Sequence, residues 1–143
     1  MHLHIATPAP AGSLHGNRIT ALRWERHLGA LGHSVTVANG WTSEPADALI
    51  ALHALRSHDA VMRFRAAYPQ RAIVLILTGT DLYRDLAGDA ASRAKVLASM
   101  QAADKLVVLQ EEAIASVPSE LRAKIVTIHQ SVPLLPTERQ TLP

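Results

Sequence analysis

Six short apolar runs recur along the 143-residue chain, and each is too short to form a helix. Their length and their content of β-branched residues are typical of strands that are buried on both faces of a sheet. We therefore expect strands at residues 3–6, 35–38, 48–52, 73–77, 106–109 and 125–128.

The segments between these runs predict helices. In residues 18–31, Ala21, Trp24, Leu28 and Leu31 recur every three or four positions and so share one face of an amphipathic helix. Further helices are expected at residues 55–67, 90–102 and 111–124, the last of them interrupted at Pro118. Because strands and helices alternate, the pattern predicts an α/β fold, a Rossmann-like parallel sheet flanked by helices.

The periodic pattern ends near the C-terminus. By length and pattern, residues 1–131 are expected to form one domain. Residues 132–143 contain three prolines and no periodicity, which indicates a linker or tail toward a further domain.

Composition excludes several classes of protein. The formal net charge is only +2, which gives little support to a nucleic-acid partner. The chain has no cysteine, so disulfides and thiolate metal sites are excluded and a reducing compartment is favoured. No apolar run approaches the roughly 20 residues of a membrane span, and the N-terminus lacks the features of a signal peptide. We therefore expect a cytoplasmic protein without a membrane partner.

The segment after the first expected strand is the most informative part of the sequence. It contains two glycines and leads into a helix that begins near Asn17 and Arg18. A strand, a glycine loop and a helix N-terminus together direct backbone N–H groups at an anion. The glycine spacing is not that of the dinucleotide-binding fingerprint, so the segment predicts a phosphate-like or nucleotide ligand without naming it. An ordinary surface loop is the alternative. The candidate binding residues are Gly12, Ser13, His15, Gly16, Asn17 and Arg18.

A second group of candidates follows other expected strands, because open parallel sheets bind ligands beyond the carboxyl ends of their strands. Thr78, Gly79, Thr80 and Asp81 follow the fourth strand, and their polar groups can bind a sugar hydroxyl or an anion. Asp81 is equally suited to cap the next turn. His53 follows the third strand and is a candidate proton carrier or anion contact.

The eight histidines do not predict a metal site. His2 and His4 alternate along the first strand, but no nearby carboxylate joins them, so we expect neutral histidines at a sheet edge. The serine-hydrolase elbow and the zinc-protease motif are also absent from the sequence. No metal, no cofactor and no particular catalytic residue is predicted.

Several strings of the sequence together resemble a known family. Residues 28–37 are similar to the first helix-to-strand junction of many GT-B glycosyltransferases. The more specific strings are residues 7–10, 15–18, 20–24, 51–54, 56–57, 77–86, 104–110 and 130–131. These resemble the N-terminal half of the selenosugar synthases of selenoneine biosynthesis, which are glycosyltransferases of the GT-B type.

The resemblance implies a fold and a reaction. It implies that the chain is the N-terminal, Rossmann-like half of a GT-B enzyme, whose C-terminal domain grips most of the nucleotide. The implied reaction joins selenophosphate, the acceptor, to the sugar of a UDP-sugar donor (UDP-N-acetylglucosamine or UDP-glucose). It forms a carbon–selenium bond and yields a selenosugar. The resemblance implies no divalent metal.

The resemblance also implies roles for residues of this sequence. The loop from Gly12 to Arg18 would contact selenophosphate or the donor diphosphate, and Thr78, Thr80 and Asp81 would orient sugar or acceptor. His53 and Arg84 are further substrate-binding candidates. A selenium nucleophile is already anionic, so no general base is named. Because no C-terminal domain follows Pro143, we expect little or no transferase activity from this chain alone. A GT-B enzyme with a hydroxyl acceptor and a non-catalytic Rossmann-like binding module are the alternatives.

Overall fold

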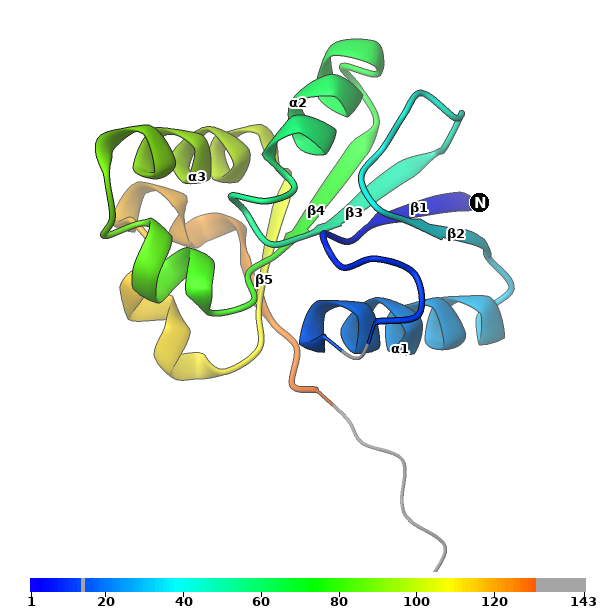
Figure 1. Ribbon diagram of the computed structural model, residues 1–143, viewed down its shortest axis with the longest axis horizontal. Helices are drawn as coiled ribbons and strands as arrows, with labels where there is room; N and C mark the ends of the chain where they lie inside the picture. Colours follow the sequence, from blue (N-terminus) through cyan, green and yellow to red (C-terminus); the bar gives the residue numbers. More distant parts are fainter. Residues whose placement is uncertain (14, 131–143) are drawn as a thin grey trace, which may run out of the picture.

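The computed structural model, which describes residues 1–13 and 15–130, contains one six-stranded parallel sheet (Figure 1). The strand order is β2-β1-β3-β4-β5-β6. The strands are β1 (His2–Ala6), β2 (Ser34–Ala38), β3 (Ala48–Leu52), β4 (Ala72–Ile76), β5 (Lys105–Val108) and β6 (Ile125–Thr127). The predicted α/β class, a Rossmann-like parallel sheet flanked by helices, is confirmed. The expected linker at residues 132–143 lies outside the described residues.

Three of the predicted helices are present, and the fourth prediction is wrong. The helices are α1 (Gly16–Ala30), α2 (His58–Ala67) and α3 (Ala90–Ala102). In place of a fourth α-helix there are two 3₁₀-helices, η2 (Glu111–Ser116) and η3 (Ser119–Lys124). Pro118 lies between them, because proline fits the start of a helix but not its interior. A π-helical turn, η1 (Asp81–Asp85), was not predicted.

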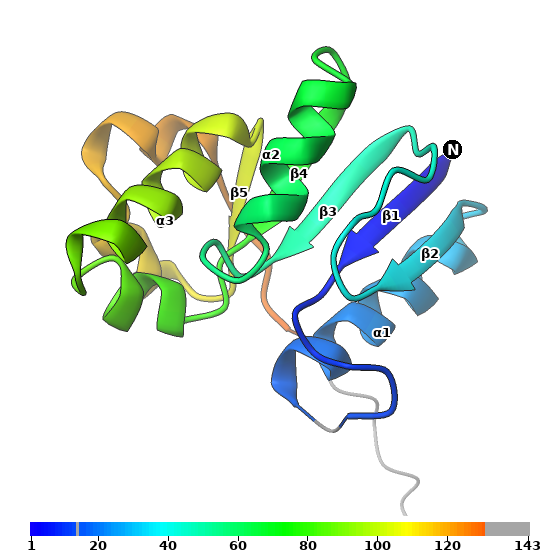
Figure 2. The same ribbon diagram turned by 45° about the horizontal axis from the view of Figure 1, so that its top comes forward.

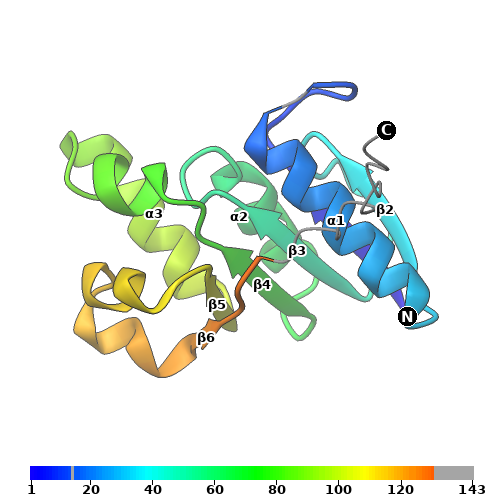
Figure 3. The same ribbon diagram turned by 90° about the horizontal axis from the view of Figure 1, so that it is seen from below.

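The helices form two layers around the sheet (Figures 2 and 3). On one face, α1 packs Ala21, Trp24 and Leu28 against apolar side chains of the inner strands. On the other face, α2, α3 and the short helices enclose the larger core, in which Phe64 and Met100 are fully buried. No helix of the described residues is long and apolar enough to cross a membrane.

The order of the strands determines where a ligand is expected. From β1 the chain runs outward to β2, and then returns past β1 to form β3 on its other side. The direction of winding therefore reverses between β1 and β3. In open parallel sheets, ligands bind beyond the carboxyl ends of the strands at such a reversal.

The connection from β2 to β3 is held by the buried His4. Its Nε2–H donates to the carbonyl oxygen of Gly40 at 2.8 Å, and Trp41 packs edge-on against Phe64 at a centroid distance of 5.2 Å. Since β1 is an inner strand and His4 is fully buried, the expectation that this histidine lies at a sheet edge is wrong. Its role in the structure is to anchor the connection.

Candidate functional site

Three adjoining hollows lie at the carboxyl edge of the sheet, the edge at which all the parallel strands end. Their volumes are about 590, 420 and 190 Å³. Thr78, just after β4, lines all three. The reversal between β1 and β3 and the N-terminus of α1 are both at this edge. The candidate site is therefore where the fold class predicts it.

The hollow of about 420 Å³, which we call the Arg56 hollow, has several lining residues that can donate a hydrogen bond, and no Asp or Glu. Arg56 has an exposed side chain, and Gly16 and Asn17 form the start of α1. His15 is the N-cap residue, and no side chain of the described residues caps this first turn. The positive end of the helix dipole and the guanidinium therefore favour an anion here. The remaining lining residues are Pro8, Ala9, Pro10, Thr78 and Thr80.

Thr80, at the rim of this hollow, is held from behind by His53. The Nε2 atom of His53 lies 2.8 Å from the Thr80 hydroxyl oxygen, and its Nδ1 accepts the backbone N–H of Arg56 at 3.1 Å. His53 is only 1% exposed. Burial lowers the pKa of His53 below its ordinary value, although the Asp81 carboxylate acts in the opposite direction. His53 therefore supports the site without facing the hollow.

Asp81 is fully buried and joins the loop after β3 to the loop after β4. Its carboxylate accepts the backbone N–H groups of Ala54 at 2.9 Å, Gly79 at 2.9 Å, Thr78 at 3.1 Å and Leu82 at 3.1 Å. Asp81 is not the N-cap residue of the next turn, as one of its two predicted roles required, because Thr80 occupies that position and Asp81 lies inside η1. Its carboxylate instead binds backbone N–H groups of two loops. The carboxylate holds the rim in place from below.

Arg84 lies outside the three hollows, with an exposed side chain. Its Nε donates to Oδ1 of the buried Asp85 at 3.0 Å. The other oxygen of that carboxylate, Oδ2, lies 3.5 Å from His53 Nε2. Arg84 thus contacts the buried Asp85 behind the site and does not line the hollows.

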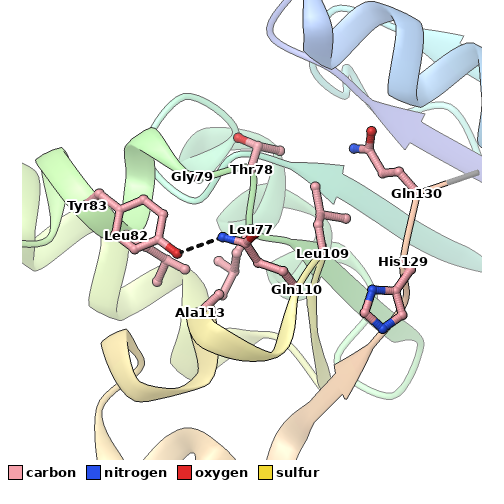
Figure 4. Close-up of a pocket in the computed structure, with 10 residues that line it drawn as sticks. All are labelled: Leu77, Thr78, Gly79, Leu82, Tyr83, Leu109, Gln110, Ala113, His129 and Gln130. Atoms are coloured by element: carbon pink, nitrogen blue, oxygen red, sulfur yellow. Dashed lines mark hydrogen bonds between the residues drawn. The ribbon is translucent and has the colours of Figure 1, made fainter.

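The largest hollow, which we call the Tyr83 hollow, is lined by neutral groups (Figure 4). The half-exposed Tyr83 accepts a hydrogen bond from Gln110 Nε2 at 3.4 Å. Gln130 lies across the hollow from Tyr83. Its side-chain amide donates to Thr20 Oγ1 and accepts from Arg23 Nη1, both on α1 and each at 3.2 Å. Leucines and an alanine supply the apolar part of the lining, and they are Leu77, Leu82, Leu109 and Ala113.

The structure brings together about half of the residues proposed from the sequence. The residues that line the hollows are His15, Gly16, Asn17, Thr78, Gly79 and Thr80. Gly12, Ser13 and Arg18 do not line them, although Ser13 Oγ lies 3.1 Å from His15 Nδ1. His53 and Asp81 are buried behind the rim.

The polar lining residues that are not among the candidates named above are Thr20, Arg56, Tyr83, Gln110, His129 and Gln130. Arg56, Gln110, His129 and Gln130 closely follow strands of the sheet, whereas Tyr83 lies on η1 and Thr20 on α1. The polar residues that follow the predicted strands do include Tyr83, Gln110, His129 and Gln130 as a plausible binding rim, but loops are polar in any case, so the pattern did not single them out. Among the described residues, no group of three or more His, Asp or Glu side chains is arranged to hold a metal ion.

No family model and no curated protein matches this chain. The fold defines the class of the protein as an α/β domain of the Rossmann-like type, and its hollows lie at the carboxyl edge of the sheet, where this class binds ligands.

Proposed function

We propose that this domain binds an oxyanion acceptor in the Arg56 hollow and that it is the acceptor-side half of a GT-B glycosyltransferase. The observation that carries the proposal is the convergence of donors on one hollow. Arg56, Thr80 and the first residues of α1 all line it, and no Asp or Glu does. A tetrahedral anion such as selenophosphate presents acceptor oxygens to each of them.

The adjoining Tyr83 hollow supports a sugar as the second ligand. Its lining combines leucines and an alanine with amides, an imidazole and a phenol, and it contains no Asp, Glu, Lys or Arg side chain. Such a lining suits a neutral ring with hydroxyl groups, in which an apolar face packs and hydroxyls hydrogen-bond. Because Thr78 borders both hollows, an anion in one and a sugar in the other would be neighbours.

The proposed reaction follows from that arrangement. The selenium of selenophosphate attacks the anomeric carbon of a UDP-sugar, a carbon–selenium bond forms, and the carbon–oxygen bond to UDP breaks as UDP leaves with the electron pair. Water then attacks phosphorus, phosphate departs, and the selenosugar retains selenium. The contribution of this domain is positioning and charge stabilisation of the acceptor. A second GT-B domain would hold the UDP.

Isothermal titration with thiophosphate, a stable analogue of selenophosphate, tests the proposed site. Arg56→Gln removes the guanidinium but keeps the backbone N–H that binds His53, so we expect a loss of affinity of about tenfold or more. The matched control is Arg63→Gln, since Arg63 is exposed on α2 and outside the hollows. Equal affinity in the two variants would overturn the assignment of the anion to this hollow.

A further inference from the structure

His53 occupies an unusual backbone conformation for its residue type. Its φ is 75°, in the left-handed region that costs most residues energy. The conformation turns the chain directly after β3 and leaves the imidazole buried between the loops that follow β3 and β4. A strained, buried and polar side chain next to a ligand hollow requires a physical reason.

The two hydrogen bonds of the imidazole determine which nitrogen carries the proton. The backbone N–H of Arg56 can only donate, so His53 Nδ1 must accept and is unprotonated. In the neutral imidazole the proton is then on Nε2, which therefore donates to the Thr80 hydroxyl oxygen at 2.8 Å. Asp85 Oδ2, 3.5 Å from Nε2, also favours a proton on that nitrogen.

This tautomer determines what Thr80 offers to a ligand. A hydroxyl has one proton, and an oxygen that accepts from Nε2–H cannot donate back to it. We infer that His53 is a positioning residue that directs the Thr80 O–H into the Arg56 hollow, so that the ligand atom facing Thr80 must be a hydrogen-bond acceptor. That this ligand is an anion rests on the proposed function, whereas the tautomer of His53 follows from its hydrogen bonds alone.

The charged groups around His53 are consistent with a neutral imidazole. Asp81 and Asp85 face it with negative charge, and Arg56 and Arg84 with positive charge. The lowered pKa of His53, caused mainly by burial, keeps the ring neutral at neutral pH. A protonated ring would place an Nδ1–H against the Arg56 N–H and would disturb the loop that carries the guanidinium.

The first test is ¹⁵N NMR of the histidine imidazoles in the ligand-free 143-residue chain, with the His53 signals assigned by their loss in His53→Asn. Asparagine is chosen because it tolerates the left-handed region. We expect a bare Nδ1 and a protonated Nε2 whose signal moves in Thr80→Val. If that substitution leaves Nε2 unmoved, or if Nδ1 carries the proton, the inference is overturned.

The second test is a double-mutant cycle read by thiophosphate affinity. We expect Thr80→Val and His53→Asn each to weaken binding about tenfold, the double variant to lose little more, and Thr80→Ser to retain most of the affinity. Additive losses would mean that His53 acts only through the fold and would overturn the inference. If His53→Asn does not fold, His53→Gly, which also tolerates the left-handed region, supplies the assignment, and the wild-type ¹⁵N spectrum and the Thr80 variants decide it. If the wild type binds no thiophosphate, the proposed function fails, while the tautomer is tested independently.

Discussion

Asp81 was predicted from the sequence as a binding residue, but it is buried and supports the loops that line the candidate site. Its carboxylate is surrounded by backbone N–H groups from two loops, and none of its surface is exposed. Three residues of the predicted motif, Thr78, Gly79 and Thr80, line the candidate hollows, and Asp81 lies beneath them. In the structure the threonines of this motif lie at the surface and the aspartate lies beneath them. This arrangement depends on the π-helical turn η1, which the sequence pattern did not predict.

We predict that Asp81→Asn lowers the free energy of unfolding by about 3 kcal/mol, because an amide nitrogen would then face backbone donors in a buried place. Urea unfolding followed by circular dichroism measures the change. Asp59→Asn is the control, since Asp59 is exposed in the first turn of α2 and its charge is worth less than about 1 kcal/mol there. A loss in Asp81→Asn no larger than in the control would contradict the role of Asp81 in joining the loops after β3 and β4.

His53 gives the stability a predicted dependence on pH. Its pKa in the folded chain is lower than the 6.5 of an unperturbed histidine, chiefly through burial. Between those two pKa values the unfolded chain binds more protons at this histidine than the folded chain does. The free energy of unfolding therefore falls as the pH decreases from about 6.5, and it stops falling once the pH is below the pKa of the folded chain. Above about pH 6.5 this contribution is fully present.

The His53→Asn variant lacks that contribution at every pH. The difference in unfolding free energy between wild type and variant should therefore shrink when the pH is lowered from about 7.5 to about 5, because only the wild type loses stability through this group. Urea unfolding at both pH values gives the difference. A constant or growing difference would show that the pKa of His53 is not lowered by folding.

At the scale of elements, the strands were predictable because burial on both faces demands continuous apolar residues. Each predicted run overlaps an observed strand and differs from it by at most a residue or two at its ends. The start of α2 was predicted too early, because His53 in its left-handed conformation turns the chain before the helix begins at His58. The α-helix predicted at residues 111–124 was wrong, because two 3₁₀-helices carry the same apolar spacing as one interrupted helix.

The C-terminus of α3 is an element whose stability depends on cations from other segments. Lys124 Nζ donates to the carbonyl oxygens of Gln101 at 2.9 Å and Ala103 at 2.8 Å, and Arg65 donates to that of Ala102 at 2.9 Å. These carbonyls lie at the negative end of the helix dipole and have no partner within the helix. The two side chains therefore fasten α3 to α2 and to η3.

We predict that Lys124→Met lowers the free energy of unfolding by about 1 to 2 kcal/mol, because methionine keeps the apolar stem but leaves the carbonyls without the ammonium group. Lys95→Met is the matched control, since the Lys95 side chain is exposed on α3 and makes no hydrogen bond among the described residues. Thermal unfolding of both variants measures the difference. Equal midpoints would contradict a capping role for Lys124.

At the scale of the whole molecule, the edge of the sheet that holds the site could be predicted, but its lining could not. The alternation of elements fixes the carboxyl edge, and six of the proposed residues line its hollows. Arg56 was missed because its place depends on how the loop after β3 turns around His53. Arg18 was included wrongly among the lining because one position along a helix changes the direction of a side chain by about 100°.

The most direct test of the central claim is an amide NMR titration of the 143-residue chain with thiophosphate and, separately, with a UDP-sugar. We predict that thiophosphate shifts the signals of Gly16, Asn17, Arg56 and Thr80, around the Arg56 hollow. The UDP-sugar should shift mainly the signals of Gln110 and Tyr83, around the Tyr83 hollow. Thiophosphate shifts that spread over other surfaces, or that are missing at ligand concentrations where the UDP-sugar binds, would contradict an anion site formed by Arg56, Thr80 and the start of α1.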